Sequence, residues 1–305
     1  MRVLLDKLIE KNRYLTTKGK VASYIPALER ANPDKIGICI ADIEGNIIAA
    51  GDYKQKFTIQ SISKTLSLML AIMDNGAEKV FSRVGMEPTG DAFNSIVKLE
   101  MISPSKPLNP MINAGAIAVA SMIKGQNSEE KFNRLLSLFR RICQNEKLDI
   151  NKEVYLSEKD TGNRNRALAY FMKDVGVFSG DVEEVLDIYF KQCSIEVDCV
   201  DVANIGLFLA NNGVILGTGE RIVEEKVAKT IKTFMVTCGM YNASGEFAIK
   251  VGIPAKSGVG GGIMATVPLR MGIGVFSPAL DEKGNSIAGY GLLKDLSEEL
   301  DLSFF

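Results

Sequence analysis

The chain has 305 residues, of which 46% are hydrophobic and 24% charged. Its 36 basic and 37 acidic residues give a net charge of −1, which offers no basic surface of the kind that nucleic acid or an anionic membrane requires. Histidine is absent, which excludes a Ser-His-Asp triad, a Cys-His pair and a histidine-ligated metal site. Any nucleophile must therefore use a lysine, a carboxylate or a tyrosine as its proton acceptor.

The first predicted element is an amphipathic helix at the N-terminus. The stretch "MRVLLDKLIEKNR" repeats leucine and isoleucine at helical spacing and is too charged for a signal peptide. No apolar run reaches membrane-spanning length. The five cysteines are scattered and include no C-x-x-C pair, which is typical of free thiols in a reducing compartment. We therefore expect a cytoplasmic protein.

Strands are predicted at both ends of the chain and helices between them. Residues 35–51 read as a hairpin turning at Glu44-Gly45-Asn46, and "KFTIQ" (56–60) as a further strand. From 61 to about 240 the pattern is helical, and Ser128 resembles a helix N-cap. Strands return at 246–254, 261–268 and 271–278, before a final amphipathic helix at 289–300.

This order predicts one antiparallel sheet made from the two ends of the chain, with a helical portion inserted between them. We expect a single α/β catalytic domain over residues 1–305. Its sheet portion would comprise residues 1–60 and 241–305, and its helical portion residues 61–240.

A Ser-x-x-Lys pattern stands at the predicted junction of sheet and helices. The pattern occurs five times, beginning at Ser61, Ser95, Ser103, Ser121 and Ser128, and chance and capping explain the last four. Residues three apart share a helix face, so Ser61 and Lys64 can meet. The positive end of the helix dipole and partial burial would lower the pKa of Lys64, as a general base requires. The alternative is an N-cap serine with a solvated lysine.

A glycine-rich stretch, "PAKSGVGGGIMATVP", follows near the C-terminus. Its glycines would allow the backbone to lie close to a ligand, or would simply form a tight turn before a strand. It matches neither a P-loop nor a dinucleotide-binding fingerprint.

The combination of Ser-x-x-Lys and Lys-Ser-Gly resembles serine β-lactamases and penicillin-binding proteins. A closer resemblance covers nearly the whole chain. The blocks "QSISK", "NPMINAGAI", "SEKDTGNRN", "YFKQCSIEV", "CGMYNASGEFA" and "PAKSGVGGGI" are similar, in this order, to those of the serine-dependent glutaminase family. The resemblance implies a β-lactamase-like fold and hydrolysis of L-glutamine to L-glutamate and ammonia.

The resemblance also implies a role for individual residues. Ser61 matches the nucleophile, Lys64 its base and Tyr241 a proton relay, while the backbone N–H groups of Ser61 and Val259 match the oxyanion hole. Together with Ser61, Tyr241 and Val259, the residues that match the substrate-binding positions are Tyr24, Asn113, Glu158, Asn165 and Tyr189. Each of these could instead be an ordinary core aromatic or surface amide. No metal or organic cofactor is implied, and a homodimer or homotetramer is expected.

Two other functions stay open. One is a different Ser-x-x-Lys acyl hydrolase acting on β-lactams or cell-wall peptides, which would need export. The other is a non-catalytic relative that binds glutamine.

Overall fold

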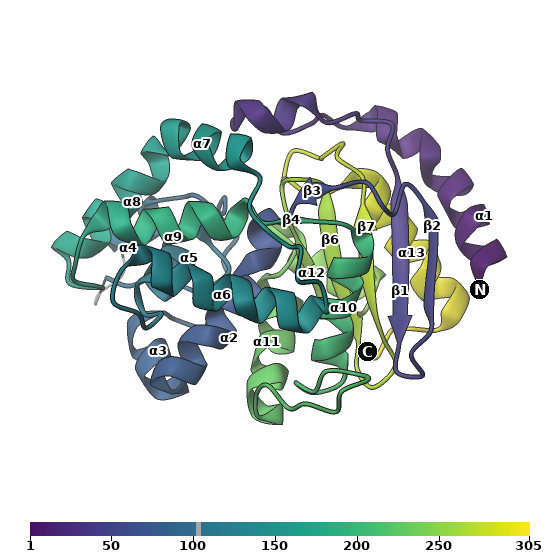
Figure 1. Ribbon diagram of the computed structural model, residues 1–305. Coiled ribbons are helices and arrows are strands. Elements are labelled where there is room, and N and C mark those ends of the chain that lie inside the picture. The colour runs from purple at the N-terminus through teal and green to yellow at the C-terminus, as the bar shows by residue number, and fades with distance from the viewer. Residues whose placement is uncertain (102–104) are drawn as a thin grey trace.

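Strands from the two ends of the chain form one antiparallel sheet (Figure 1). The computed structural model describes residues 1–101 and 105–305, so Ser103 of the third Ser-x-x-Lys lies outside the described residues. The sheet has five strands in the order β2-β1-β7-β6-β5. They are β1 (Gly37–Asp42), β2 (Ile47–Gly51), β5 (Ala255–Ser257), β6 (Gly262–Val267) and β7 (Met271–Phe276). Strand β1 pairs directly with β7, Ile40 facing Ile273, which confirms the predicted sheet.

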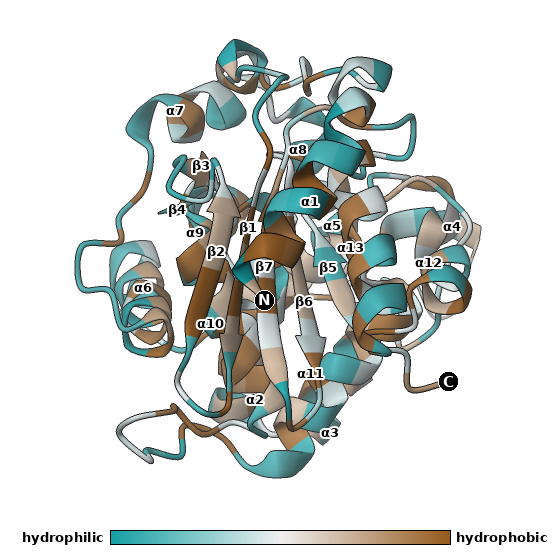
Figure 2. Ribbon diagram, turned by 90° about the vertical axis from the view of Figure 1, so that its right-hand side faces the viewer, coloured by the Kyte–Doolittle hydropathy of each residue, from teal (hydrophilic) through white to brown (hydrophobic). Residues whose placement is uncertain are grey.

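Helices cover both faces of this sheet. On one face, α1 (Arg2–Asn12) and α13 (Ile287–Leu300) share a buried apolar core with the strands. Figure 2 shows α1 in front of the sheet, with hydrophilic and hydrophobic residues alternating along its ribbon. On the other face lies α10 (Cys199–Ala210).

Glycines allow α10 to lie directly on the sheet backbone. A Cβ added to Gly272 would be 1.9 Å from the backbone nitrogen of Leu207, and one added to Gly206 would be 2.5 Å from the carbonyl oxygen of Ala265. Only a residue without a side chain fits at such distances. The glycines of β7 and α10 therefore set the spacing between helix and sheet.

The remaining helices pack around α2 (Lys64–Asn75), which is buried from Lys64 to Ile72. They are α3 (Ala77–Arg83), α4 (Val97–Met101), α5 (Asn113–Ser121), α6 (Ser128–Cys143), α7 (Lys152–Thr161), α8 (Asn163–Asp174), α9 (Val182–Cys193), α11 (Glu225–Cys238) and α12 (Ser244–Lys250). Strands β3 (Phe57–Thr58) and β4 (Glu196–Val197) pair in a separate two-stranded sheet. β3 lies in the chain between β2 and α2, and β4 between α9 and α10.

Three local predictions were wrong. Residues 246–254 were expected to form a strand, but residues 246–250 lie in α12, where Phe247 is buried and Ile249 is exposed. A short apolar run does not distinguish helix from strand by its spacing alone. The strand "KFTIQ" is reduced to β3 and pairs with β4, outside the five-stranded sheet. The N-cap of α6 is Asn127 rather than Ser128, because the Asn127 side chain accepts from the Glu130 N–H.

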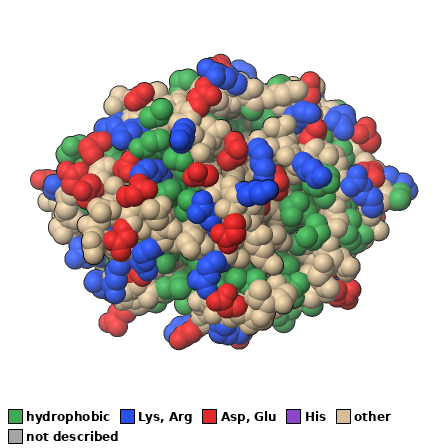
Figure 3. All heavy atoms as spheres, in the orientation of Figure 1, with side chains coloured by type: hydrophobic (Ala, Val, Ile, Leu, Met, Phe, Trp, Pro, Cys, Tyr) green, Lys and Arg blue, Asp and Glu red, His purple; other side chains and the backbone are tan. Residues whose placement is uncertain are grey.

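The surface shows mixed charge. In Figure 3 acidic and basic side chains are interspersed over the face in view, as the nearly equal counts of the two suggest. Among the described residues, no helix combines the length and the apolar character needed to cross a membrane.

Candidate active site

Ser61 and Lys64 lie in the connection between β3 and α2. A 3₁₀ turn, Gln60–Ser63, leads directly into α2, whose first residue is Lys64. Gln60 has a φ of +49°, a backbone conformation uncommon for a residue with a side chain. The Ser63 hydroxyl supports the turn by donating to the Gln60 carbonyl oxygen at 2.7 Å. The turn holds Ser61 in a buried position, with 6% of its surface exposed.

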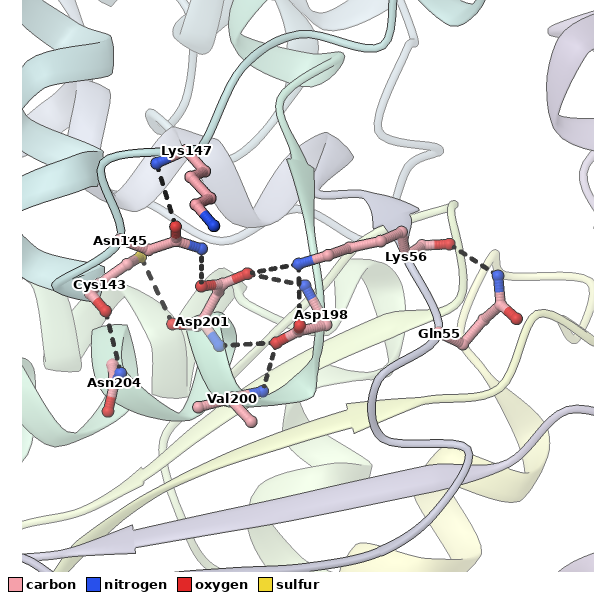
Figure 4. Close-up of polar contacts among 9 residues, drawn as sticks. All are labelled: Gln55, Lys56, Cys143, Asn145, Lys147, Asp198, Val200, Asp201 and Asn204. Carbon is pink, nitrogen blue, oxygen red and sulfur yellow. Dashed lines mark hydrogen bonds and ion pairs between the residues drawn. The ribbon is translucent and has the colours of Figure 1, made fainter.

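An ion-pair network anchors the segment that precedes this turn (Figure 4). Lys56 Nζ lies 2.8 Å from Asp198 Oδ2 and 3.3 Å from Asp201 Oδ2. The two aspartates form the capping box of α10, each accepting from the backbone N–H of the other. Asn145 Nδ2 donates to Asp201 Oδ1 at 2.8 Å. The network therefore ties the chain leading to Ser61 to the helix that packs on the main sheet.

Lys64 is buried among uncharged partners. Its Nζ donates to Asn113 Oδ1 at 2.8 Å and to the Met111 carbonyl oxygen at 3.1 Å. Burial lowers the pKa of Lys64 to about 8, although Glu158 opposes this by favouring the ammonium form. A lysine of this pKa is neutral often enough near pH 7 to accept a proton.

Two asparagines extend the polar chain that begins at Lys64. Asn113 is the first residue of α5, and its Nδ2 donates to Asn165 Oδ1 on α8 at 3.0 Å. Because Asn113 Oδ1 already accepts from Lys64, its amide orientation is fixed. The structure thus brings Lys64, Asn113 and Asn165 together from three different helices.

Tyr241 joins the Ser61 turn to the glycine-rich turn. Its hydroxyl is hydrogen-bonded to the Ser61 side chain, accepts from the backbone N–H of Val259, and donates to the Ser257 carbonyl oxygen at 3.3 Å. Burial raises the pKa of Tyr241, and the Ser61 hydrogen bond opposes that rise. Its φ of +52° is again in the left-handed region. Tyr241 therefore links Ser61 to Val259.

A second buried lysine supports the Tyr241 ring. Lys256 Nζ lies 4.5 Å from the ring centroid, and it donates to the carbonyl oxygens of Ser257 at 2.6 Å and Gly239 at 3.1 Å. Burial lowers the pKa of Lys256 well below its ordinary value, and Lys64 acts in the same direction. On the other side the Phe93 ring packs against Tyr241 with the centroids 4.8 Å apart.

The glycine-rich turn between β5 and β6 lies against the backbone before Ser61. A Cβ added to Gly260 would be 2.5 Å from the Thr58 carbonyl oxygen, and one added to Gly258 would be 2.7 Å from that of Ile59. The glycines are therefore needed for close approach, as one of the two sequence interpretations held. Within this turn, the Val259 N–H points to Tyr241 rather than into the strand ladder.

A buried carboxylate and two tyrosines complete the site. Glu158 on α7 is 6% exposed, and burial raises its pKa to about 8, while Lys64 and a hydrogen bond with Gln60 oppose the rise. Among the described residues, Glu158 Oε2 has no hydrogen-bond partner. The pKa of Tyr189 is raised by burial and by nearby Cys193 and Glu158. Tyr24 exposes 54% of its surface, yet burial of its hydroxyl, with Tyr241 and Glu158 nearby, raises its pKa.

All nine residues singled out in the sequence thus lie in one region, linked by hydrogen bonds or by electrostatic influence on one another. Sequence reasoning missed three more. Gln60 contacts Glu158, Lys256 supports Tyr241, and the Cys193 thiol is hydrogen-bonded to the side chains of Ser63 and Tyr189. Lys256 is the lysine of the Lys-Ser-Gly motif, Cys193 stood within a quoted block and Gln60 directly precedes Ser61, but none of the three was selected as a site residue.

The described part of the chain offers no metal centre. Over residues 1–101 and 105–305, no group of three or more cysteine, aspartate or glutamate side chains is arranged to hold a metal ion.

Comparison with known proteins identifies the family. The model of the glutaminase family matches residues 19–305. Glutaminase 2 of Clostridium perfringens is 59% identical, and the glutaminase of Alkaliphilus oremlandii 61%, both over 305 residues and 100% of each chain.

Solved structures agree. A Bacillus glutaminase is 44% identical with a TM-score of 0.93, covering 100% of this chain and 99% of its own. A probable glutaminase from Bacillus subtilis complexed with 6-diazo-5-oxo-L-norleucine is 42% identical with a TM-score of 0.92, covering 100% and 97%. These neighbours confirm the β-lactamase-like fold expected from the sequence. Because the family model and these relatives match nearly the whole chain, it belongs to the glutaminase family.

Proposed function

We propose that this chain hydrolyses the side-chain amide of L-glutamine to L-glutamate and ammonia, with Ser61 as the nucleophile. One observation carries the proposal. The Ser61 side chain is hydrogen-bonded to Tyr241, whose hydroxyl also accepts from the Val259 N–H, and the same turn carries a buried lysine whose pKa is about 8. A nucleophile, a base, a proton relay and a backbone donor thus converge at one point.

In the first half-reaction, neutral Lys64 takes the proton of Ser61 as its Oγ attacks the carboxamide carbon. The tetrahedral oxyanion is held by the backbone N–H groups of Ser61 and Val259, and such donors typically contribute about 3 kcal/mol each. The substrate oxygen replaces the Tyr241 hydroxyl as the acceptor of the Val259 N–H. Collapse breaks the C–N bond, Tyr241 relays a proton to the leaving nitrogen, and ammonia departs.

In the second half-reaction, water attacks the glutamyl ester on Ser61. The Lys64 and Tyr241 pair accepts the water proton, and the oxyanion occupies the same two N–H groups. Collapse returns the proton to Ser61 Oγ and releases L-glutamate. No bond in either half-reaction requires a metal or an organic cofactor.

The remaining polar groups suit the two charged ends of a free amino acid. Glu158 is a buried carboxylate of the site, and its Oε2 has no hydrogen-bond partner in the described part of the chain, so it is suited to the substrate ammonium. Asn165, Asn113 and the tyrosine hydroxyls of Tyr24 and Tyr189 can hydrogen-bond the carboxylate and the amide. A site that buries such groups rejects analogues that leave them unpaired.

The test is ammonia release from L-glutamine, with L-asparagine alongside, for the native protein, Ser61→Ala and a control. Ser61→Ala should lower kcat by about 10⁴-fold or more, as loss of a nucleophile does. The control Ser137→Ala removes an exposed hydroxyl on α6 and should match the native protein. Release that survives Ser61→Ala would refute the assignment of the nucleophile. Glutamine binding without any release would instead indicate a non-catalytic relative.

We also propose a cytoplasmic homo-oligomer, either a dimer or a tetramer. All five cysteines are free and buried, which suits a reducing compartment. Large apolar side chains are exposed, among them Ile249 at 88% and Phe305 at 74%, and such residues are candidates for subunit contacts. Light scattering after size-exclusion chromatography would measure the assembly, and a monomeric mass would contradict it.

A further inference from the structure

Lys256 is a buried lysine to which the proposed mechanism gives no task. Its exposed fraction is 0%, and it is among the largest side chains of the interior. Its Nζ donates to the carbonyl oxygens of Ser257 at 2.6 Å and Gly239 at 3.1 Å, and it lies 4.5 Å from the centroid of the Tyr241 ring. A charged group is costly to bury unless its charge is compensated or used.

No carboxylate compensates Lys256 within residues 1–101 and 105–305, since none of the ion pairs there includes it. The groups that act most on its charge are Lys64 and the thiols of Cys238 and Cys193. Lys64 disfavours a second positive charge, and burial raises the pKa of both thiols, which keeps them uncharged near pH 7. The charge of Lys256 is therefore not neutralised by an ion pair.

The three neighbours of the Lys256 amine are all electron-rich. Two carbonyl oxygens and the face of the Tyr241 ring together match the three N–H donors of an ammonium. A neutral amine has two such donors and would direct its lone pair at one of these groups, which repels it. Burial lowers the pKa of Lys256, whereas this arrangement of acceptors favours the charged form.

The two carbonyl groups do not need Lys256 as their donor. The Gly239 carbonyl oxygen also accepts from the Ser257 N–H at 3.1 Å, and that of Ser257 also accepts from the Tyr241 hydroxyl at 3.3 Å. A methionine of similar length would leave neither oxygen without a donor, and it would remove an uncompensated buried charge. A purely structural role therefore does not account for a lysine at this position.

The Tyr241 oxygen is where negative charge arises in the proposed mechanism. Tyr241 gives its phenolic proton to the leaving nitrogen as the C–N bond breaks, and it regains a proton from Lys64, which took that of Ser61. Between these two transfers Tyr241 is a phenolate. Burial opposes this form, because it raises the pKa of Tyr241, and a nearby positive charge favours it.

We propose that Lys256 is a positioning residue whose ammonium stabilises the phenolate of Tyr241 and so speeds the proton relay. The inference rests on the proposed function. The charge lies over the ring, whose electrons share the negative charge of the phenolate. Lys256 also holds the Ser257 carbonyl oxygen by the shorter of its two bonds, so this oxygen retains the Tyr241 proton only weakly.

The test is a double-mutant cycle of Lys256→Met and Tyr241→Phe, measured as kcat for ammonia release from L-glutamine. Phenylalanine keeps the ring beside Lys256 and removes only the hydroxyl. In the native background Lys256→Met should lower kcat about 30-fold, and by no more than Tyr241→Phe does, because Lys256 acts through that hydroxyl. In the Tyr241→Phe background the same change should lower kcat by less than about twofold. KM should stay the same in both.

Lys232→Met is the matched control, because it removes another buried lysine and should leave kcat unchanged in both backgrounds. The melting temperature of Lys256→Met should be no lower than that of the native protein, since a buried charge without a carboxylate partner is removed. Equal losses of kcat in the two backgrounds, or no loss in the native one, would overturn the inference. Should Lys256→Met not fold, Lys256→Gln enters the same cycle, because it keeps an N–H donor and lacks the charge.

Ammonia release by the native protein and by Ser61→Ala separates this inference from the proposed function. No release by the native protein would refute the proposed function and the inference with it. Release that Ser61→Ala abolishes, together with equal losses in the two backgrounds of the cycle, would refute the inference alone.

Discussion

Two turns meet at the proposed active site and are built in opposite ways. The turn at Gln60–Lys64 carries polar side chains at every position but one and places a residue with a side chain at a φ of +49°. The turn at Gly258–Gly262 carries four glycines. At two of them an added Cβ would lie within 3 Å of the backbone of residues 58 and 59. The first turn supplies side chains, whereas the second supplies a backbone N–H and needs side chains to be absent.

The difference teaches what each turn tolerates. A change in the first turn removes a side chain that we propose to take part in the reaction, and it leaves the backbone in place. A change in the second leaves every reacting side chain in place and moves the backbone donor. Tyr241 is hydrogen-bonded to both turns, so its hydroxyl can be removed to ask whether they act together.

After loss of Ser61 itself, the largest effect should follow removal of the proposed base from the first turn. Lys64→Met keeps the length of the side chain and should lower kcat by about 10³- to 10⁴-fold, because Ser61 loses its proton acceptor. The matched control is Lys232→Met, which removes another buried lysine that donates to an asparagine, Asn212, at 2.7 Å. Steady-state ammonia release decides the matter, and equal rates for the two variants would show that Lys64 is structural.

The second turn should be broken by a single methyl group. In Gly260→Ala the new Cβ would meet the Thr58 carbonyl oxygen at 2.5 Å, so the turn and its Val259 N–H must shift. We expect kcat to fall about 10²- to 10³-fold, the usual cost of losing an oxyanion donor. Gly245→Ala, in α12 with no atom within 4 Å of the new Cβ, should leave kcat unchanged. Thermal unfolding of both variants separates loss of fold from loss of the donor, and full activity of Gly260→Ala in a folded protein would contradict the role of this turn.

A smaller effect is expected when the link between the turns is cut. Tyr241→Phe removes the hydroxyl and keeps the ring between Phe93 and Lys256. The kcat should fall about 10²-fold. The leaving nitrogen must then gain its proton, and the attacking water lose one, without the Tyr241 relay. Single-turnover measurements should show both half-reactions slowed. A change confined to KM would assign Tyr241 to substrate binding alone.

The smallest effect is a shift with pH. Lys64 must be neutral to act as a base, and its lowered pKa is about 8. Glu158 must be ionised to bind an ammonium, and its raised pKa is also about 8. Both requirements are lost as pH falls, so kcat/KM should rise with pH through about 8 and drop about tenfold or more per unit well below it. A kcat/KM that is flat from pH 6 to pH 9 would contradict both assignments.

Much of the fold could be predicted because its signals are local. The alternation and glycine turn of residues 35–51 specify a hairpin, and the apolar periodicity of residues 64–72 specifies a buried helix. The prediction was wrong at residues 246–250, where Phe247 and Val251 are buried with helical spacing inside a run that also fits a strand. The length of β3 was also mispredicted. Its length is set by pairing with β4, which lies far away in the sequence, so residues 56–60 alone do not contain that information.

The sequence by itself determined which chemistry is possible in this protein. Without histidine, a nucleophile has to use a lysine, a carboxylate or a tyrosine as its base, and the spacing of three residues allows Ser61 and Lys64 to meet on one side of a turn. The block order indicated the family, which the comparisons confirm. Only the tertiary structure decided the pKa values of these residues and the contacts between them. The pKa of Lys64 depends on burial against Asn113 and Met111, and the contact of Tyr241 with Val259 depends on a glycine turn lying on β3. Burial and close backbone approach are properties of packed elements, and no single segment of the sequence contains them.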